Sequence, residues 1–192
     1  FGLSTGLYYV PGNYTPTEEV IEIARAVAPL GGIHISHMRD EAAGILESVK
    51  ETIRIGEEGG LPTQITHHKI IGAPNWGLSK ETLRLVEEAR ARGVDVTIDQ
   101  YPYTASSTGT RVLFPQWSQE GGRKQFLARL QDPATRARLK AAAVANILEN
   151  RGGGDPKNIV IASCSFDPSL AGKSLAQITR ERGVEPTPES AA

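Results

Sequence analysis

The sequence lacks several features that would indicate whole classes of protein. Its 192 residues include a single cysteine, Cys164, so no disulfide can form within the chain. No apolar run approaches membrane-spanning length, and no charged segment followed by a hydrophobic one resembles a signal peptide. A net charge of −1 supplies no field that would attract nucleic acid or anionic lipid. We therefore expect neither nucleic acid nor membrane as a partner, and the cytoplasm is the default location.

Both ends of the chain look cut. Phe1 is not a start residue, and the chain stops at Glu189-Ser-Ala-Ala192, just after a Thr-Pro pair suited to opening a helix. We therefore expect the chain to be part of a longer protein. Its length predicts one domain, or one and a fraction, with a sizeable core.

Short β-branched runs alternate with segments of helical periodicity in the first half of the chain. The strand ends are expected near Thr5, His37, His67 and Asp99. Their spacing of about 30 residues is the length of one strand–helix unit. This alternation predicts a parallel sheet with helical cover.

The rhythm breaks after Tyr103, where a Ser/Thr/Gly-rich loop begins. An Ala/Arg/Leu-rich helical stretch, broken once by proline, follows over residues 126–149, and a further strand is expected at 158–162. We therefore divide the chain in two. Residues 1–108 hold the strand–helix units, and residues 109–192 are a truncated inserted segment of loop, helix and one strand.

Two of the expected strands end in a histidine rather than in another apolar residue. Alternation places His37 on the face of Ile35 and His67 on the face of Ile65. The carboxyl ends of parallel strands are where binding and catalytic groups gather, because the loops there can vary. Two imidazoles from adjacent strands supply half of a tetrahedral zinc shell. A catalytic zinc has three protein ligands and an open position, so a further ligand must come from elsewhere.

The same residue types also have structural interpretations. A lone histidine at a strand end is more often a hydrogen-bonded structural group than a ligand, although two at the same relative place reverse that preference. His34 and His68 are expected on the other faces of their strands, as packing or supporting groups. Lys69 could be a solvated strand exit, and Tyr101 with Tyr103 could form a rigid packed turn.

Four motifs follow one another in order, and the resemblance that they carry runs over essentially the whole chain. They are Gly2-Leu-Ser-Thr-Gly-Leu-Tyr-Tyr-Val-Pro-Gly12, Ser36-His-Met-Arg-Asp-Glu41, Ile65-Thr-His-His-Lys69 and Asp99-Gln-Tyr-Pro-Tyr-Thr-Ala-Ser-Ser-Thr108. Together they resemble the N-acyl-D-amino-acid deacylases (D-aminoacylases) of the metal-dependent amidohydrolase superfamily. The resemblance implies an α/β fold, a partial TIM-like (β/α) barrel of about four consecutive strand–helix units plus part of an inserted helical and strand segment.

The resemblance also implies roles for individual residues. It makes His37 and His67 ligands of Zn2+ from two successive barrel strands. Lys69 and Tyr101 resemble residues that hold the carbonyl and carboxylate region of the substrate. The remaining substrate contacts that it implies are Ser107, a polar contact near that region, and Tyr8 and Tyr9, part of the aromatic wall of an acyl pocket.

The chain departs from the family pattern at three points. In this family the first barrel strand carries a His-x-His pair, a later strand carries a cysteine ligand, and the last strand carries the catalytic aspartate. The chain has none of these, because Cys164 follows the fourth strand and no aspartate matches the last-strand pattern. No catalytic residue is therefore expected in this chain, and the hydroxide that attacks the carbonyl would lack its activator.

The sequence thus predicts the central portion of a zinc-dependent hydrolase that cleaves the amide bond of N-acyl-D-amino acids with zinc-activated water. Two alternatives stay open. One is another metal-dependent amidohydrolase acting on cyclic amides. Lys69 and the Tyr-Pro-Tyr run at 101–103 argue against this alternative. The other is a non-catalytic α/β module with structural histidines. The preferred D-amino acid and acyl group, the number of metals and the oligomeric state are not determined by the sequence.

Overall fold

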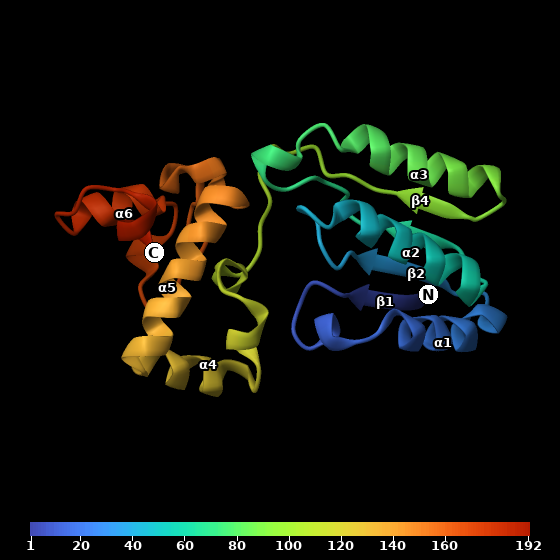
Figure 1. Cartoon of the computed structure of the whole chain (residues 1–192), viewed down its shortest axis with the longest axis horizontal. Coiled ribbons are helices and arrows are strands. Elements are labelled where there is room, and N and C mark those ends of the chain that lie inside the picture. The colour runs from blue at the N-terminus through green and yellow to red at the C-terminus, as the bar shows by residue number, and fades with distance from the viewer. The chain divides into compact units, whose positions relative to one another are not determined.

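The computed structural model describes residues 1–192 and contains two compact units (Figure 1). Unit 1 comprises Phe1–Ile71 and Asn75–Tyr103, and unit 2 comprises Gly72–Pro74 and Thr104–Ala192. The division at residue 108 into a barrel portion and an inserted segment stays a prediction.

Unit 1 is a four-stranded parallel sheet whose strands neighbour one another in chain order (Figure 1). Its elements are β1 (Gly2–Gly6), α1 (Thr17–Val27), β2 (Ile33–His37), α2 (Ile45–Gly59), β3 (Thr63–Ile65), α3 (Ser79–Ala91) and β4 (Val96–Ile98). A helix connects each strand to the next, as a parallel pair requires. The predicted parallel sheet with helical connections is confirmed.

The core of unit 1 lies between the sheet and its helices. Ile65 and Val96 of the strands are fully buried with Ile45 and Val49 of α2 in one cluster. A second cluster joins Leu7 to α1 and α2, and its buried members are Leu7, Val20, Ile21, Ala24, Ile55 and Leu61. Burial of these apolar side chains is the main force holding the helices on the sheet.

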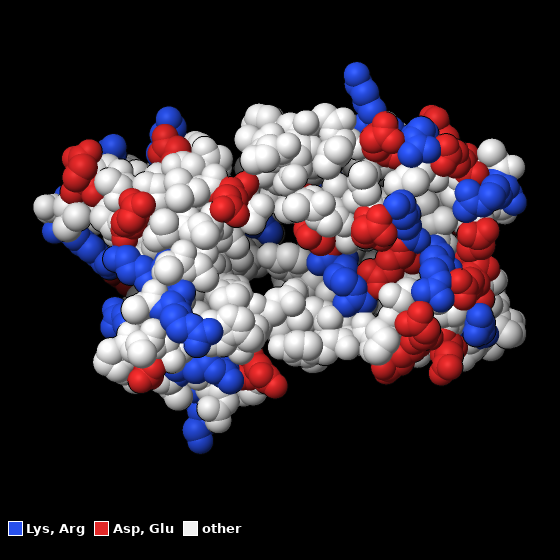
Figure 2. Space-filling model, viewed as in Figure 1, with Lys and Arg blue, Asp and Glu red and all other residues white.

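The outer surface of the helices of unit 1 carries interspersed acidic and basic side chains (Figure 2). Arg54 of α2 pairs with Glu58 on its own helix and with Glu18 of α1. Arg84 of α3 pairs with Glu88 one turn further on. These pairs are exposed, so they contribute little to stability.

His34 is a buried polar group inside the sheet layer. Its ring is fully buried, with Nε2 2.9 Å from the Thr5 hydroxyl and Nδ1 2.8 Å from the Thr63 hydroxyl. Burial lowers the pKa of His34 from its ordinary value of 6.5 to about 4. Its ring therefore links three neighbouring strands, and the expectation that it is a packing group is confirmed.

Unit 2 is mainly helical. Its helices are α4 (Gly122–Gln131), α5 (Pro133–Glu149), α6 (Leu175–Glu181) and α7 (Pro188–Ala191). The break before Pro133 was expected, and there the Asp132 carboxylate accepts a hydrogen bond from the Thr135 N–H, capping α5. The strand expected at 158–162 is wrong, because this segment forms only an isolated bridge between Val160 and Ser174. No helix in either unit combines the length and apolar character that crossing a membrane needs.

Replacing Gly56 by alanine should destabilise unit 1. An added Cβ at Gly56 would lie 2.6 Å from Cγ2 and 2.8 Å from Cβ of Thr63, so α2 would have to move off β3. We expect a loss of about 1–3 kcal/mol in the free energy of unfolding, against the usual gain from alanine in a helix. Denaturant unfolding measures this, with Lys50→Ala on the exposed side of α2 as the control. An unchanged or raised stability would show that the helix does not approach the sheet this closely.

Stability should fall in acid because of His34. Its folded pKa lies below the unfolded one, so the unfolded chain takes up the proton first and stability is lost as pH falls from about 6.5 towards 4. The loss attributable to this residue should reach about 3 kcal/mol. His34→Gln keeps polar contacts without titrating, so its unfolding free energy should depend less on pH over this window. Parallel pH profiles of the two proteins would contradict the assignment.

Candidate metal centre

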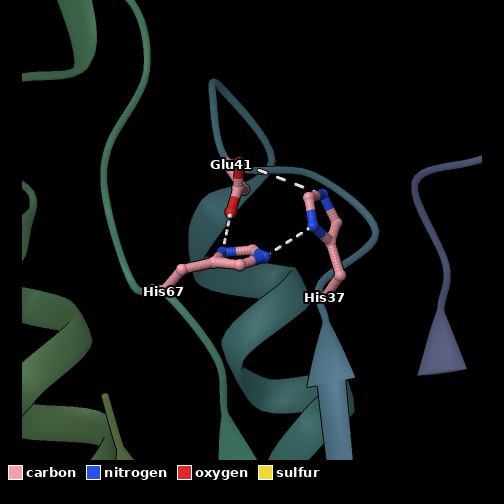
Figure 3. A group of neighbouring side chains, drawn as sticks. All are labelled: His37, Glu41 and His67. Carbon is pink, nitrogen blue, oxygen red and sulfur yellow. Dashed lines mark hydrogen bonds and ion pairs between the residues drawn. The ribbon is translucent and has the colours of Figure 1, made fainter. Parts of the chain in front are cut away.

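Two imidazoles meet at the carboxyl ends of neighbouring strands (Figure 3). His37 is the last residue of β2, and His67 lies in the turn that follows β3. Nδ1 of His37 is 2.7 Å from Nε2 of His67, and the ring centroids are 4.4 Å apart. Both side chains are partly exposed, at 17% for His37 and 29% for His67, so an ion from solvent can reach them.

The backbone at His67 is what turns its ring towards His37. Ser36 and Ile65 are register partners in the parallel pair, so their side chains lie on one side of the sheet, opposite to His37. Had β3 continued, His67 would lie on that side too. Instead β3 ends at Ile65 and His67 has a φ of 42°. The expectation that His67 shares a face with Ile65 is therefore wrong, because a left-handed residue interrupts the alternation.

Asp99, just beyond β4, stabilises this left-handed turn. Its Oδ1 accepts a hydrogen bond of 2.6 Å from the His67 N–H, and its carbonyl accepts one of 2.9 Å from the His68 N–H. Its own N–H donates to the Ile65 carbonyl at 3.1 Å, and its Oδ2 accepts from the Gln64 amide. A left-handed conformation is costly for a residue with a side chain, and these bonds offset that cost.

Glu41 is the third member of the cluster, and the sequence interpretation missed it. Its carboxylate lies beside both rings (Figure 3), is 97% buried and also contacts Lys69. Oε1 lies 3.1 Å from Nδ1 of His67, and Oε2 lies 4.0 Å from Nε2 of His37. The ligand atoms of His37, Glu41 and His67 all lie within 4.8 Å of one another. The available signal was its place in the motif, four residues after His37.

The loop that carries Glu41 is fixed on both sides. The Asp40 carboxylate accepts hydrogen bonds from the N–H groups of Ala42 and Gly44, at 2.7 and 3.0 Å. The Glu41 carbonyl accepts one of 2.7 Å from the Ile71 N–H, beyond β3. The Glu41 side chain is thus held at the strand ends by backbone contacts that do not involve the histidines.

Lys69 lies against the same carboxylate. Its ammonium is 2.5 Å from Glu41 Oε1 and 2.9 Å from Nδ1 of His67, and its side chain is 19% exposed. It is therefore not a solvated strand exit. Its Nζ also lies 5.7 Å from the centroid of the Tyr101 ring, which is 6.5 Å from the ring of His67.

Two tyrosines of the loop after β1 flank His37. The Tyr8 and Tyr9 ring centroids lie 5.7 and 4.8 Å from that of His37. The loop is tied to β2 by a 3.1 Å hydrogen bond from the Leu7 N–H to the His37 carbonyl. Unit 1 therefore gathers six of the seven predicted site residues. The seventh, Ser107, lies in unit 2 with an exposed side chain. The roles of all seven stay predictions.

The other two histidines have hydroxyl partners outside the cluster. His68 is buried, with Nε2 3.0 Å from the Thr82 hydroxyl of α3. Burial, and then the charge of Lys69, lower the pKa of His68. Like His34, it is a packing group, as expected.

The cluster offers a donor set that suits zinc, namely two imidazole nitrogens with a carboxylate oxygen beside them. Two nitrogen ligands of a tetrahedral zinc stand about 3.3 Å apart. The facing nitrogens of His37 and His67 are 2.7 Å apart, so a separation by well under an ångström would admit the ion. The residues present therefore fit the metal.

Comparison with known proteins shows that the chain is similar to deacylases. The chain is 50% identical over 107 residues to the D-aminoacylase of Alcaligenes xylosoxydans xylosoxydans, covering 56% of this chain and 22% of that protein. It is 42% identical over 115 residues to an N-acyl-D-glutamate deacylase of the same organism, covering 60% and 23%. The chain thus spans less than a quarter of these curated relatives. No family model matches the sequence.

Solved structures of the same kind match almost the whole chain. An N-acyl-D-glutamate deacylase from Bordetella bronchiseptica, in complex with zinc and a phosphonate inhibitor, matches with a TM-score of 0.69 and 30% identity, over 98% of this chain and 31% of that one. A D-aminoacylase described as defining a novel subset of amidohydrolases matches at 0.66 and 35%, over 96% and 31%. The resemblance to this family is confirmed, and so is the fold class, a partial α/β barrel.

The left-handed backbone at His67 should make glycine more stabilising than alanine at this position. Glycine adopts a φ of 42° freely and alanine does not, so His67→Gly should be more stable than His67→Ala by about 1 kcal/mol. Both variants lose the same ring contacts, so the difference isolates the backbone. Denaturant unfolding measures it, and the same pair at His68, whose φ is not positive, should show the reverse order. If the glycine and alanine variants rank in the same order of stability at both positions, backbone strain at His67 is ruled out.

Proposed function

We propose that this chain is a segment of a zinc-dependent hydrolase that cleaves the amide bond of N-acyl-D-amino acids. The observation that supports this most directly is the convergence of His37 and His67, from two motifs that resemble deacylases, on one point at the strand ends. The relatives that bear these activities are more than four times longer than the matched part, so the activity is proposed for the whole protein.

The zinc would be held by His37 and His67, through the facing Nδ1 and Nε2 atoms. When bound, such an ion polarises a scissile carbonyl and lowers the pKa of its water to about 7. The rings of Tyr8 and Tyr9 beside His37 would form part of the wall of an acyl pocket. Ser107 is proposed as a further polar contact of the substrate.

Lys69 is suited to hold an anionic substrate. An ammonium has three donors, and two of them are directed at Glu41 Oε1 and at the His67 carbonyl, 3.1 Å away. The third donor, on the ammonium 2.9 Å from Nδ1 of His67, would be turned to the carbonyl or carboxylate region of an N-acyl-D-amino acid. Tyr101, whose ring lies beside this ammonium, would contact the same region.

The small molecule is the partner that this site supports, and we propose the cytoplasm as the location, since the chain has only one cysteine. The His-x-His pair, the cysteine ligand and the catalytic aspartate that the resemblance leads one to expect would be supplied by the rest of the protein. Nucleic acid and membrane have no place in this proposal.

Zinc titration of the chain tests the metal site. We expect His37→Ala and His67→Ala each to weaken zinc binding by at least about tenfold, because each removes one of two nitrogen ligands. Competition with a chromophoric chelator measures the affinity. His68→Gln is the matched control, since that ring bonds to Thr82 instead. If all three variants bind zinc as the parent does, the histidines are structural and the non-catalytic module is the better interpretation.

The isolated chain should show weak or no turnover. It lacks an aspartate at the position where the resemblance places the general base, so water at the site would not be activated efficiently. The measurement is release of the D-amino acid from N-acetyl-D-amino acids in the presence of added zinc. Turnover that requires zinc and disappears in His67→Ala would contradict this expectation and show that these strand ends suffice.

A further inference from the structure

The buried carboxylate of Glu41 has no part in the function proposed above. We propose that Glu41 is a positioning residue, which accepts the Nδ1–H of His67 so that Nε2 is presented to the metal, and which anchors Lys69 without itself binding the ion. The statement about zinc rests on the proposed function, whereas the statement about the His67 tautomer does not.

The two nitrogens of His67 face different partners. Nδ1 lies 3.1 Å from Glu41 Oε1, and Nε2 lies 2.7 Å from Nδ1 of His37. A carboxylate is only an acceptor, so it selects the tautomer with the proton on Nδ1. That tautomer leaves a lone pair on Nε2, to which His37 donates its Nδ1–H. The nitrogen that would bind zinc is thus kept free of a proton by the carboxylate on the far side of the ring.

Lys69 would otherwise impose the opposite arrangement. Its ammonium is 2.9 Å from Nδ1 of His67, and a donor there would require Nδ1 to accept and Nε2 to carry the proton. Nε2–H would then point at Nδ1 of His37 and block the space between the rings. Glu41 opposes this, because an unprotonated Nδ1 would set its lone pair against the carboxylate oxygen 3.1 Å away, and because the Lys69 ammonium has other acceptors in Glu41 Oε1, at 2.5 Å, and in the His67 carbonyl.

The geometry speaks against Glu41 as a metal ligand. An ion bound by Glu41 would use Nδ1 of His67 and Nε2 of His37, and it would leave the closest nitrogen pair of the cluster unused. The ammonium of Lys69 touches the same carboxylate oxygen and would repel a cation there. In other metal sites, a histidine ligand donates its second ring N–H to a carboxylate, and this hydrogen bond fixes the orientation of the ring.

The His67 tautomer can be measured directly in the full chain labelled with 15N-histidine. At about pH 8, where unperturbed imidazoles are neutral, long-range 1H–15N correlations should show His67 protonated on Nδ1. Glu41→Gln should keep that tautomer, because an amide oxygen still accepts, whereas Glu41→Ala should lose it. Glu51→Gln, which removes a carboxylate of α2 that pairs with Arg39, is the control and should leave the His67 signals unchanged. An unchanged tautomer in Glu41→Ala would overturn the proposal.

Zinc added to the same samples tests whether Nε2 of His67 binds the metal and Glu41 does not. The 15N shifts should report ligation at Nε2 of His67 and Nδ1 of His37. Zinc affinity should fall about 10–100-fold in Glu41→Ala and only a few-fold in Glu41→Gln. Ligation at Nδ1 of His67, or an equal loss in both variants, would make Glu41 a ligand and overturn the proposal. If the parent binds no zinc but its tautomer responds as described, the proposed function fails and the positioning role stands.

Discussion

The hydrogen bond between the Asp99 carboxylate and the His67 N–H is the contact on which the candidate centre depends. It holds a non-glycine residue at a φ of 42°, and that conformation aims the His67 ring across the sheet edge. In a strand that continued with its regular alternation, the two rings would lie on opposite sides of the sheet. The third and fourth strands thus cooperate, because the end of one sets the direction of a side chain on the other.

The strand ends were predictable because their signals are local. A β-branched run that stops at a histidine marks the end of β2, and the alternation of Ile35 and His37 holds because β2 runs straight through that residue. The parallel order of the strands was predictable from the regular alternation of strands and helices, which is also a local signal. A periodic pattern predicts an element well wherever its backbone stays regular.

The rest of the centre depends on contacts between distant residues. No local signal marks His67 as left-handed, since glycine or asparagine usually takes that conformation. The burial of Glu41 comes with contacts to both histidines and to Lys69, 28 positions later, so no signal close to it in the sequence marks it. In unit 2, the segment at Val160 has strand-like composition but finds only one bridge partner, so no strand forms.

The 2.7 Å contact between His37 and His67 is a ring–ring hydrogen bond that joins the ends of two strands. An ion held by both rings would replace this hydrogen bond with two metal–nitrogen bonds, and the His37 proton would then sit on the other nitrogen of that ring, Nε2, which lies 4.0 Å from the second oxygen of Glu41. Magnesium and calcium, which prefer oxygen, gain too little from imidazole to open such a contact. Zinc and its borderline-soft neighbours bind imidazole well, so under the proposed function this pair of rings would favour them over magnesium and calcium.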